Sequence, residues 1–524
     1  MSLQNTNNKG KAVVKMEQVA DDAPAPVLAV GSRVKKEVLD PLTPVGTDEV
    51  VSPVTTEDDD DTIEGEHLAG SVWETARSSS SAPAPLMPAV PVPYVLIAPP
   101  AILPAFQRPD DTSMLLIKNL MRRCVTSLAT GNITEANTVL LLMSSLASID
   151  GGPIQRVAFT FFEALGRRAL RMLPGLSWAL QPQMTEPPKP AYKDTARRCL
   201  QVVCPFLRVA SSVSNHAILT AMQGERHVHI VDLGGASPDQ WLDMLRLFAG
   251  RPEGPPALRL TVVSAQEGFL SSTASLLNHE AVRLNVPFIF NPVCTHIDRI
   301  CAFDISAFGV YHGEATAISS TLQLHRLIAD ITNIQIAAAP PPGATSASAT
   351  ASGHHFQKHE ITKADALLRV LCDLSPKVMV VTEQEANHNG DNLWDRTCNA
   401  FDHYAVLFHD LEAGGAATAP DREAVERLLL REEIIDIVAS DGSARRERHE
   451  SMDHWVQRMA MAGFQPSHVM SFNAFADMEL LKLQMSVDGM FRYWVVKDST
   501  YLIIYSGKTP MFSVTAWRPA RNIW

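Results

Sequence analysis

A short apolar segment that ends in a carboxylate and two glycines constrains the fold of this chain more than any other feature. His227–Asp232 reads His-Val-His-Ile-Val-Asp, and Leu-Gly-Gly follows it. The residues from Val228 to Val231 are apolar or readily buried and favour β structure, and a helical pattern begins at Trp241. This order of strand, turn and helix predicts the first unit of a nucleotide-binding type of α/β sheet. In such sheets, ligands lie beyond the carboxyl ends of the strands.

Strand and helix patterns alternate after this segment. Strands are expected at 228–233, 258–264, 288–293, 314–318 and 378–383. Helices between them are typical of a mostly parallel sheet that is covered on both faces. Shorter runs at 466–472, 493–497, 502–505 and 512–517 predict an antiparallel finish.

The rest of the chain is expected to form a tail, a cap and an insertion. Residues 1–110 are rich in Pro, Ala, Ser and Val and carry 16 acidic against 8 basic residues, which is about −8 of the formal charge of −12. This composition predicts a disordered acidic tail. Amphipathic patterns predict a helical cap over 111–225, ahead of an α/β core over 226–519. The Pro-, Ser- and Ala-rich stretch at about 337–360 predicts a disordered insertion in that core.

Composition narrows the classes of function. The near-neutral folded part argues against the broad basic surface that sequence-independent nucleic-acid binding needs. Seven scattered cysteines without a CxxC pattern predict reduced thiols in a reducing compartment. No run approaches the roughly 20 apolar residues of a membrane helix. The GxSxG, GxxxxGK and HExxH signatures of common enzymes are absent from the sequence.

The crevice of the predicted sheet offers two groups of polar residues. A dehydrogenase or methyltransferase would use Asp232 and the glycines after it to approach a cofactor, with an acidic residue at the end of the second strand. Here that strand ends in Ser264, and the turn is not GxGxxG, so a sheet without a cofactor is favoured. The stretch from Glu383 to Asn389 gathers carboxylates, amides and a histidine, which turn formation and helix capping explain more simply than catalysis or metal binding.

A basic run near the end of the chain has two interpretations. Arg445, Arg446 and Arg448 alternate with Glu447 and are expected to open a solvated helix that carries Trp455. A surface for a partner or for nuclear import is the alternative.

Four ordered blocks over about residues 113–519 resemble the plant GRAS family of transcriptional regulators, in particular its Scarecrow-like three subgroup. The block similar to the family's VHIID motif contains Val228, His229, Ile230, Val231, Asp232, Gln240 and Trp241. The PFYRE-like block contains Pro376, Glu383, Glu385, Asn387, Trp394, Arg396 and Tyr404. The SAW-like region contains Arg445, Arg446, Glu447, Arg448, Thr515, Ala516 and Trp517. Leucine-rich helices flank the first block.

The chain departs from the family pattern at several positions. Thr515 replaces the serine of the SAW tripeptide, and Gly234 stands where the subgroup has an aspartate. Because Gly234 has no carboxylate, the chain lacks the acidic side chain that other members of the subgroup could use for an interaction at this position. No DELLA-type N-terminal motif is present, so the resemblance does not imply a gibberellin-receptor degron.

The resemblance implies a Rossmann- or methyltransferase-like sheet with an N-terminal helical cap, and a nuclear co-regulator that is not an enzyme and needs no cofactor. It implies roles in gibberellin signalling and in root and developmental patterning. The implied partners are other GRAS proteins, including DELLA and Scarecrow or Short-root types, and zinc-finger factors of the indeterminate-domain type. Contact with DNA would be indirect, membranes would play no part, and homo- or heterodimers are implied as well.

Three hypotheses about function follow. In the first, an apolar surface on the cap, with Leu115, Leu116 and Leu120, binds partner proteins. In the second, a small molecule or methyltransferase-type cofactor binds the crevice at Asp232 and Glu383. In the third, the arginines of the basic run bind DNA directly.

Overall fold

The computed structural model describes residues 111–175, 196, 199–200, 203–300, 305–337, 356–413, 419–470 and 493–520. The predicted tail of residues 1–110 and most of the predicted insertion lie outside these ranges. All the helices and strands described below belong to one compact unit.

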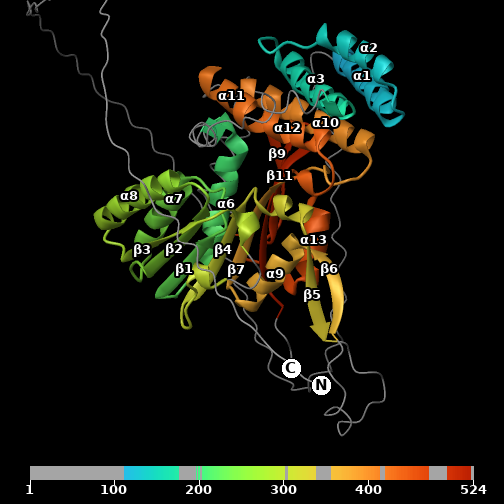
Figure 1. Cartoon of the computed structure of the whole chain (residues 1–524). Helices are drawn as coiled ribbons and strands as arrows, with labels where there is room; N and C mark the ends of the chain where they lie inside the picture. Colours follow the sequence, from blue (N-terminus) through green and yellow to red (C-terminus); the bar gives the residue numbers. More distant parts are fainter. Residues whose placement is uncertain are drawn as a thin grey trace, which may run out of the picture. The chain divides into compact units, whose positions relative to one another are not determined.

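Nine strands among the described residues form one sheet (Figure 1). They are β1 (His227–Asp232), β2 (Ala257–Ser264), β3 (Phe288–Cys294), β4 (Ala315–Thr321), β7 (Val378–Gln384), β8 (Phe464–Pro466), β9 (Tyr493–Lys497), β10 (Tyr501–Ser506) and β11 (Thr509–Pro519). The order is β3-β2-β1-β4-β7-β11-β10-β9, with β8 beside β11. The first five strands are parallel and the others antiparallel. The predicted mostly parallel sheet with an antiparallel finish is confirmed, and its strand order reverses between β1 and β4.

The central parallel strands bury both of their faces because helices cover both sides of the sheet, whereas β3 at the edge has no fully buried residue. On β1, Val228 and Ile230 enter one apolar core, while Val231 enters the other. The first core is covered by α6 (Pro205–Ala221), α7 (Pro238–Ala249) and α8 (Glu267–Arg283). The second is covered by the 3₁₀ helix η3 (Leu324–Ala329), α9 (Lys363–Asp373) and α13 (Met452–Met461). Full burial of one such aliphatic side chain contributes about 1.5–3 kcal/mol.

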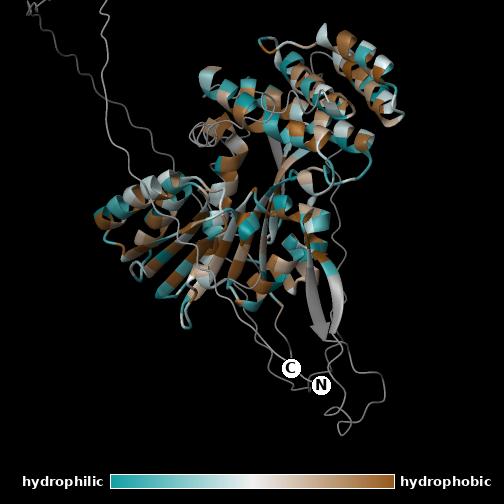
Figure 2. Ribbon diagram, viewed as in Figure 1, coloured by the Kyte–Doolittle hydropathy of each residue, from teal (hydrophilic) through white to brown (hydrophobic). Residues whose placement is uncertain are grey.

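Figure 2 shows apolar residues concentrated on the central strands, where the two cores meet the sheet. Within the described part of the chain, no helix combines the length and the apolar character that crossing a membrane requires.

The helical cap combines two distant parts of the chain. It contains α1 (Asp111–Ala129), α2 (Ile133–Ser144), α3 (Pro153–Arg171), α10 (Leu393–Ala413), α11 (Ala419–Val425), a π-helical turn (Glu426–Leu430) and α12 (Arg431–Ala439). Phe161 of α3 packs edge to face on Phe401 of α10, with 5.3 Å between ring centroids. The buried Arg156 donates to Glu426 at 2.8 Å. The cap therefore extends beyond the predicted range of 111–225.

Helix α6 lies within the predicted range of the cap but is not part of the cap. It was expected in the cap, but it packs on the sheet against α7, β7 and β11. An amphipathic pattern shows which face of a helix is buried but does not show which element covers that face.

A two-stranded hairpin was not predicted. Strands β5 (Ile331–Ala337) and β6 (Phe356–Thr362) pair antiparallel on either side of residues 338–355. The end of the stretch expected as a loop is therefore strand from Phe356 onward.

Candidate functional site

The VHIID-like block forms a closed turn at the carboxyl end of β1. One carboxylate oxygen of Asp232 accepts a hydrogen bond from the amide of Gly234 at 2.9 Å, and the other accepts one from Trp241 Nε1 at 3.1 Å. Burial raises the pKa of Asp232 to about 7, although both hydrogen bonds lower it. Because both oxygens bind protein donors, Asp232 holds α7 against β1 and does not offer a free carboxylate to a ligand.

The two glycines of this turn lie against neighbouring strands. Gly235 has a φ of +89°, and a Cβ atom there would lie 1.7 Å from the carbonyl oxygen of Thr321 at the end of β4. Gly234 has a φ of +107°, and its Cβ would lie 2.9 Å from the carbonyl oxygen of Val263. The position at which the subgroup has aspartate therefore has a backbone here that favours glycine.

The other residues of this block serve packing. His229 is fully buried, its Nε2 lies 2.8 Å from the Thr261 hydroxyl, and burial lowers its pKa to about 4. Asn215 of α6 donates to the Gln240 carbonyl oxygen at 2.7 Å, and Gln240 Nε2 donates back to Asn215 Oδ1 at 3.3 Å. The first contact joins β1 to β2, and the other two join α6 to α7.

A pocket of about 370 Å³, with both polar and apolar lining, opens where the strand order reverses. Its lining includes Gly235, Thr321, Gln323, His325, Glu433 and Glu447. These residues come from the turn after β1, the end of β4, η3, α12 and the segment before α13. Ligands of open α/β sheets bind at this place.

His325 connects two carboxylates beside the pocket. Its Nδ1 lies 2.7 Å from Glu383 Oε2, and its Nε2 lies 2.8 Å from Glu447 Oε2. The other oxygen of Glu383 accepts a hydrogen bond from the Leu324 amide at 2.9 Å. Burial alone would lower the pKa of His325, but the charges and hydrogen bonds of Glu383 and Glu447 raise it to about 10. Glu383, chosen from the sequence, is thus a structural partner of a histidine that the sequence did not indicate.

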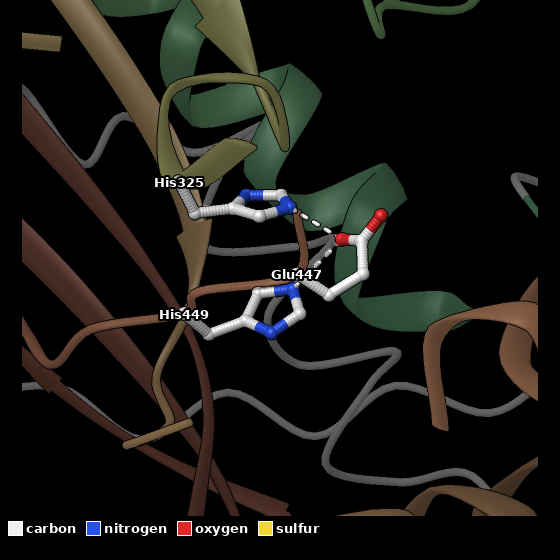
Figure 3. Close-up of side chains that lie close together, drawn as sticks. All are labelled: His325, Glu447 and His449. Atoms are coloured by element: carbon white, nitrogen blue, oxygen red, sulfur yellow. Dashed lines mark hydrogen bonds and ion pairs between the residues drawn. The ribbon is translucent and has the colours of Figure 1, made fainter. Parts of the chain in front are cut away.

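Three more buried histidines lie near His325, namely His388, His403 and His449. We call these four residues the histidine cluster. The rings of His325 and His449 have centroids 4.1 Å apart and are tilted by 30°, and both face Glu447 (Figure 3). His449 Nδ1 lies 3.0 Å from His388 Nδ1. Burial, followed by the charge of His325, lowers the pKa of His449 well below its usual range.

Several ring nitrogens of the histidine cluster lack partners. Among the described residues, no hydrogen bond reaches His449 Nε2, His388 Nε2 or either ring nitrogen of His403. Burial lowers the pKa of His403 to about 4. Unpaired buried polar atoms are costly, so the cluster differs from the Asp232 turn, where both carboxylate oxygens are paired.

The PFYRE-like residues mostly hold helices in place. Glu385 accepts hydrogen bonds from the Met452 amide at 2.9 and 3.0 Å, at the start of α13, and burial raises its pKa to about 7. The buried Arg396 donates to the Ile437 carbonyl oxygen at 2.9 Å and joins α10 to α12. The Tyr404 hydroxyl lies 2.7 Å from Glu433 Oε2.

The remaining three residues of that block differ in exposure. Pro376 is buried before β7, and Asn387 is exposed. Trp394 is half-buried, with the Arg122 guanidinium 5.7 Å from the centre of its ring. Asn387 and Trp394 thus reach the surface, whereas Arg396 and Tyr404, which follow them in the block, are buried.

The basic run is not the solvated helix that we expected. It follows the 3₁₀ turn Gly442–Ala444 and is not helical until α13 begins at Met452. Arg445 is only 2% exposed and donates to the His388 carbonyl oxygen at 2.6 Å. Arg446 pairs with Asp330 at 2.6 Å, and Arg448 donates to Asn389 Oδ1 at 2.8 Å. These arginines bind the protein itself, which argues against the third hypothesis.

The SAW-like tripeptide lies inside the sheet. Thr515, Ala516 and Trp517 belong to β11, pair with β7 and are buried. Trp517 Nε1 donates to the Thr515 hydroxyl at 2.8 Å. Threonine in place of serine thus keeps the hydroxyl that accepts this hydrogen bond.

The predicted partner surface is partly wrong. Leu115 and Leu116 of α1 are 61% and 47% exposed, but Leu120 is 7% exposed and belongs to the core. Leu141 and Leu142 of α2, which the prediction missed, are 65% and 47% exposed. Helices α1 and α2 pack against each other, so all four exposed leucines lie on one pair of helices. We call Leu115, Leu116, Leu141 and Leu142 the leucine surface.

Comparisons with known proteins agree with this architecture. The sequence profile of the GRAS domain family matches residues 117–518. Scarecrow-like protein 3 of Arabidopsis thaliana is 35% identical over 451 residues, which cover 78% of this chain and 90% of the relative. GRAS family protein TF80 of Medicago truncatula is 31% identical over 75% of this chain and 93% of its own length. The crystal structure of SCL7 from Oryza sativa superposes with a TM-score of 0.57 at 26% identity, over 76% of this chain and 99% of that one.

The chain belongs to the GRAS domain family. Its relatives include DELLA proteins and PAT1 of Arabidopsis thaliana, which is named a Scarecrow-like transcription factor. At the level of the family, the protein is therefore a plant transcriptional regulator.

Proposed function

We propose that this protein is a nuclear transcriptional co-regulator that acts through protein–protein contacts and reaches DNA through its partners. The observation that carries the proposal is the leucine surface, because exposed apolar patches on soluble proteins mark interaction sites. The basic run also supports the proposal. Its side chains Arg445, Arg446 and Arg448 contact other groups of the protein, which disfavours direct binding of DNA through them.

We propose as the partner a second GRAS protein of the DELLA or Scarecrow and Short-root types, as a hetero- or homodimer. Zinc-finger factors of the indeterminate-domain type would then supply the DNA contact. Relatives named as DELLA proteins and as Scarecrow-like proteins support this choice. A role in gibberellin signalling and in root or developmental patterning follows from the same proposal.

Binding of the purified full chain to a DELLA protein tests the surface. The Leu116→Asp, Leu142→Asp double variant places charge on both helices, and binding should weaken at least about tenfold, which corresponds to about 1.4 kcal/mol. Leu276→Asp, a change at a 44% exposed leucine on α8, is the matched control and should bind normally. Equal binding by the double variant and the control would remove the leucine surface from the account.

A second experiment addresses direct DNA binding. DNA affinity of the full chain is measured against salt concentration, with the Arg446→Ala, Arg448→Ala pair beside it. If these two arginines contacted phosphates, DNA affinity would depend steeply on salt. The slope of log affinity against log salt concentration would then be smaller by about two in the double variant. We expect identical slopes, because both side chains are held by protein groups.

A further inference from the structure

We propose that His325, Glu447 and His449 bind one divalent transition-metal ion, such as Zn²⁺. Each residue offers one ligand atom, and the three atoms lie within 4.8 Å of one another. Two imidazoles and one carboxylate form a ligand set suited to zinc. The inference concerns the histidine cluster alone and does not rest on the proposed function.

The spacing of the three ligand atoms fits a shared ion. Glu447 Oε2 lies 2.8 Å from His325 Nε2 and 3.8 Å from His449 Nε2. Two ligands that are each 2.0–2.1 Å from a tetrahedral zinc ion lie about 3.3 Å apart. The two observed distances lie on either side of this value, and all three atoms lie within 4.8 Å of one another, so adjustments of the side chains can bring them around one ion. Figure 3 shows both Nε2 atoms facing the same carboxylate oxygen.

The free nitrogen of His449 is an independent observation that points to a ligand. This side chain is 1% exposed, and among the described residues its Nε2 has no hydrogen-bond partner. At 3.8 Å, Glu447 Oε2 is too distant for a hydrogen bond. A buried polar atom without a partner destabilises the folded state. An ion between His449 Nε2 and Glu447 Oε2 would give the nitrogen a partner.

Both histidines also have the outer contacts that metal-binding histidines need. A ligating histidine normally donates its second ring N–H to a neighbouring acceptor, which fixes its orientation. His325 Nδ1 lies 2.7 Å from Glu383 Oε2, and His449 Nδ1 lies 3.0 Å from His388 Nδ1. Each Nε2 is thereby directed toward Glu447. Binding of an ion would release to solvent the proton that His325 Nε2 shares with Glu447.

Access and charge also suit an ion. His325 and Glu447 line the pocket at the reversal of strand order, so an ion bound between them has a route from solvent and room for a fourth ligand such as water. The carboxylates of Glu383 and Glu447 lie on either side of His325 and offset the charge of a divalent ion. Such an ion would fasten η3 to the segment before α13.

Metal titration of the full chain tests the site. The chain is stripped with a chelator and titrated with Zn²⁺ by calorimetry, and then with Co²⁺, whose visible absorption reports tetrahedral coordination. His449→Asn keeps a polar group near the Nδ1 position but has no atom at Nε2, and Glu447→Gln removes the carboxylate. We expect one Zn²⁺ per chain and an affinity at least about 100-fold lower in both variants.

Controls separate this site from surface histidines. His454→Asn changes an exposed histidine on α13, and His354→Ala with His355→Ala changes two that lie outside the described residues. Both should bind one Zn²⁺ normally. The inference is overturned when the full chain binds no stoichiometric Zn²⁺, or when His449→Asn and Glu447→Gln bind it as the controls do.

A second measurement covers the case in which both variants fail to fold, as judged by circular dichroism. X-ray absorption spectroscopy of the zinc-loaded, unaltered chain then counts the imidazole ligands. Two imidazoles per ion support the site, and fewer than two overturn it.

Discussion

The Asp232 turn and the histidine cluster both lie at the carboxyl ends of parallel strands, yet they treat polar atoms differently. At the turn, both oxygens of the Asp232 carboxylate are hydrogen-bonded by protein donors. In the cluster, ring nitrogens of three histidines lack partners among the described residues. A fully paired group serves the fold, whereas a buried group without partners is explained by a ligand or carries a cost in stability. The Asp232 turn of the VHIID-like block therefore stabilises the fold, whereas the neighbouring histidine cluster is the place where a ligand can bind.

The largest effect is expected at the turn, for Gly235→Ala. The new Cβ would meet the Thr321 carbonyl oxygen at 1.7 Å, and the φ of +89° disfavours a side chain. The free energy of unfolding should fall by at least about 4 kcal/mol, which chemical denaturation measures. Gly254→Ala is the matched control, because Gly254 has a φ of +86° but nothing within 4 Å of the new Cβ. It should cost only about 1–2 kcal/mol. Similar losses in both variants would contradict the closed turn.

A smaller effect, with a pH dependence, is expected for Asp232→Asn. Folded Asp232 keeps its proton up to about pH 7, whereas in the unfolded chain it loses the proton near 3.8. The folded state thus binds more protons between these values, so the stability contributed by Asp232 falls as pH rises through this window. The stability advantage of the unaltered chain over the variant should shrink by about 2 kcal/mol from pH 5 to pH 8.

Urea titrations at several pH values measure this difference. Asp239→Asn, an exposed change in the first turn of α7, is the control. An advantage that stays constant with pH would show that Asp232 is not a buried acid.

The smallest effect is expected in the cluster, for His403→Leu. Both ring nitrogens of this buried histidine lack hydrogen bonds within the described part of the chain. Replacing an unpaired polar ring with an apolar side chain should leave stability unchanged or raise it by about 1 kcal/mol. His388→Leu should instead destabilise the chain, because it removes the contact with His449. Thermal melting compares the two, and a loss in His403→Leu equal to that in His388→Leu would mean that His403 is a paired structural residue.

The sheet was predictable from the sequence because its signal is local. The expected runs, with helices between them, match β1, β2, β3 and β7 within about one residue. The run expected at 314–318 ends three residues before β4, which extends to Thr321. Hairpin β5–β6 was missed because its strands lie on either side of a low-complexity stretch. The composition of the cap depends on long-range packing between α3 and α10–α12, which no local pattern encodes.

The site was less predictable because charged residues were assumed to face solvent. Arg445, Glu447 and His449 point inward at every second position, as in an extended segment, and this alternation was the available signal. His325 belongs to no motif and is recognised only by its neighbours in space.

The most direct test of the account is capture of nuclear proteins by the full chain, with and without nuclease, read by mass spectrometry. The account predicts that GRAS or zinc-finger proteins are recovered equally after nuclease treatment and are lost in the Leu116→Asp, Leu142→Asp variant. Recovery that disappears with nuclease and is insensitive to the leucines would contradict it and would make the chain a direct DNA binder.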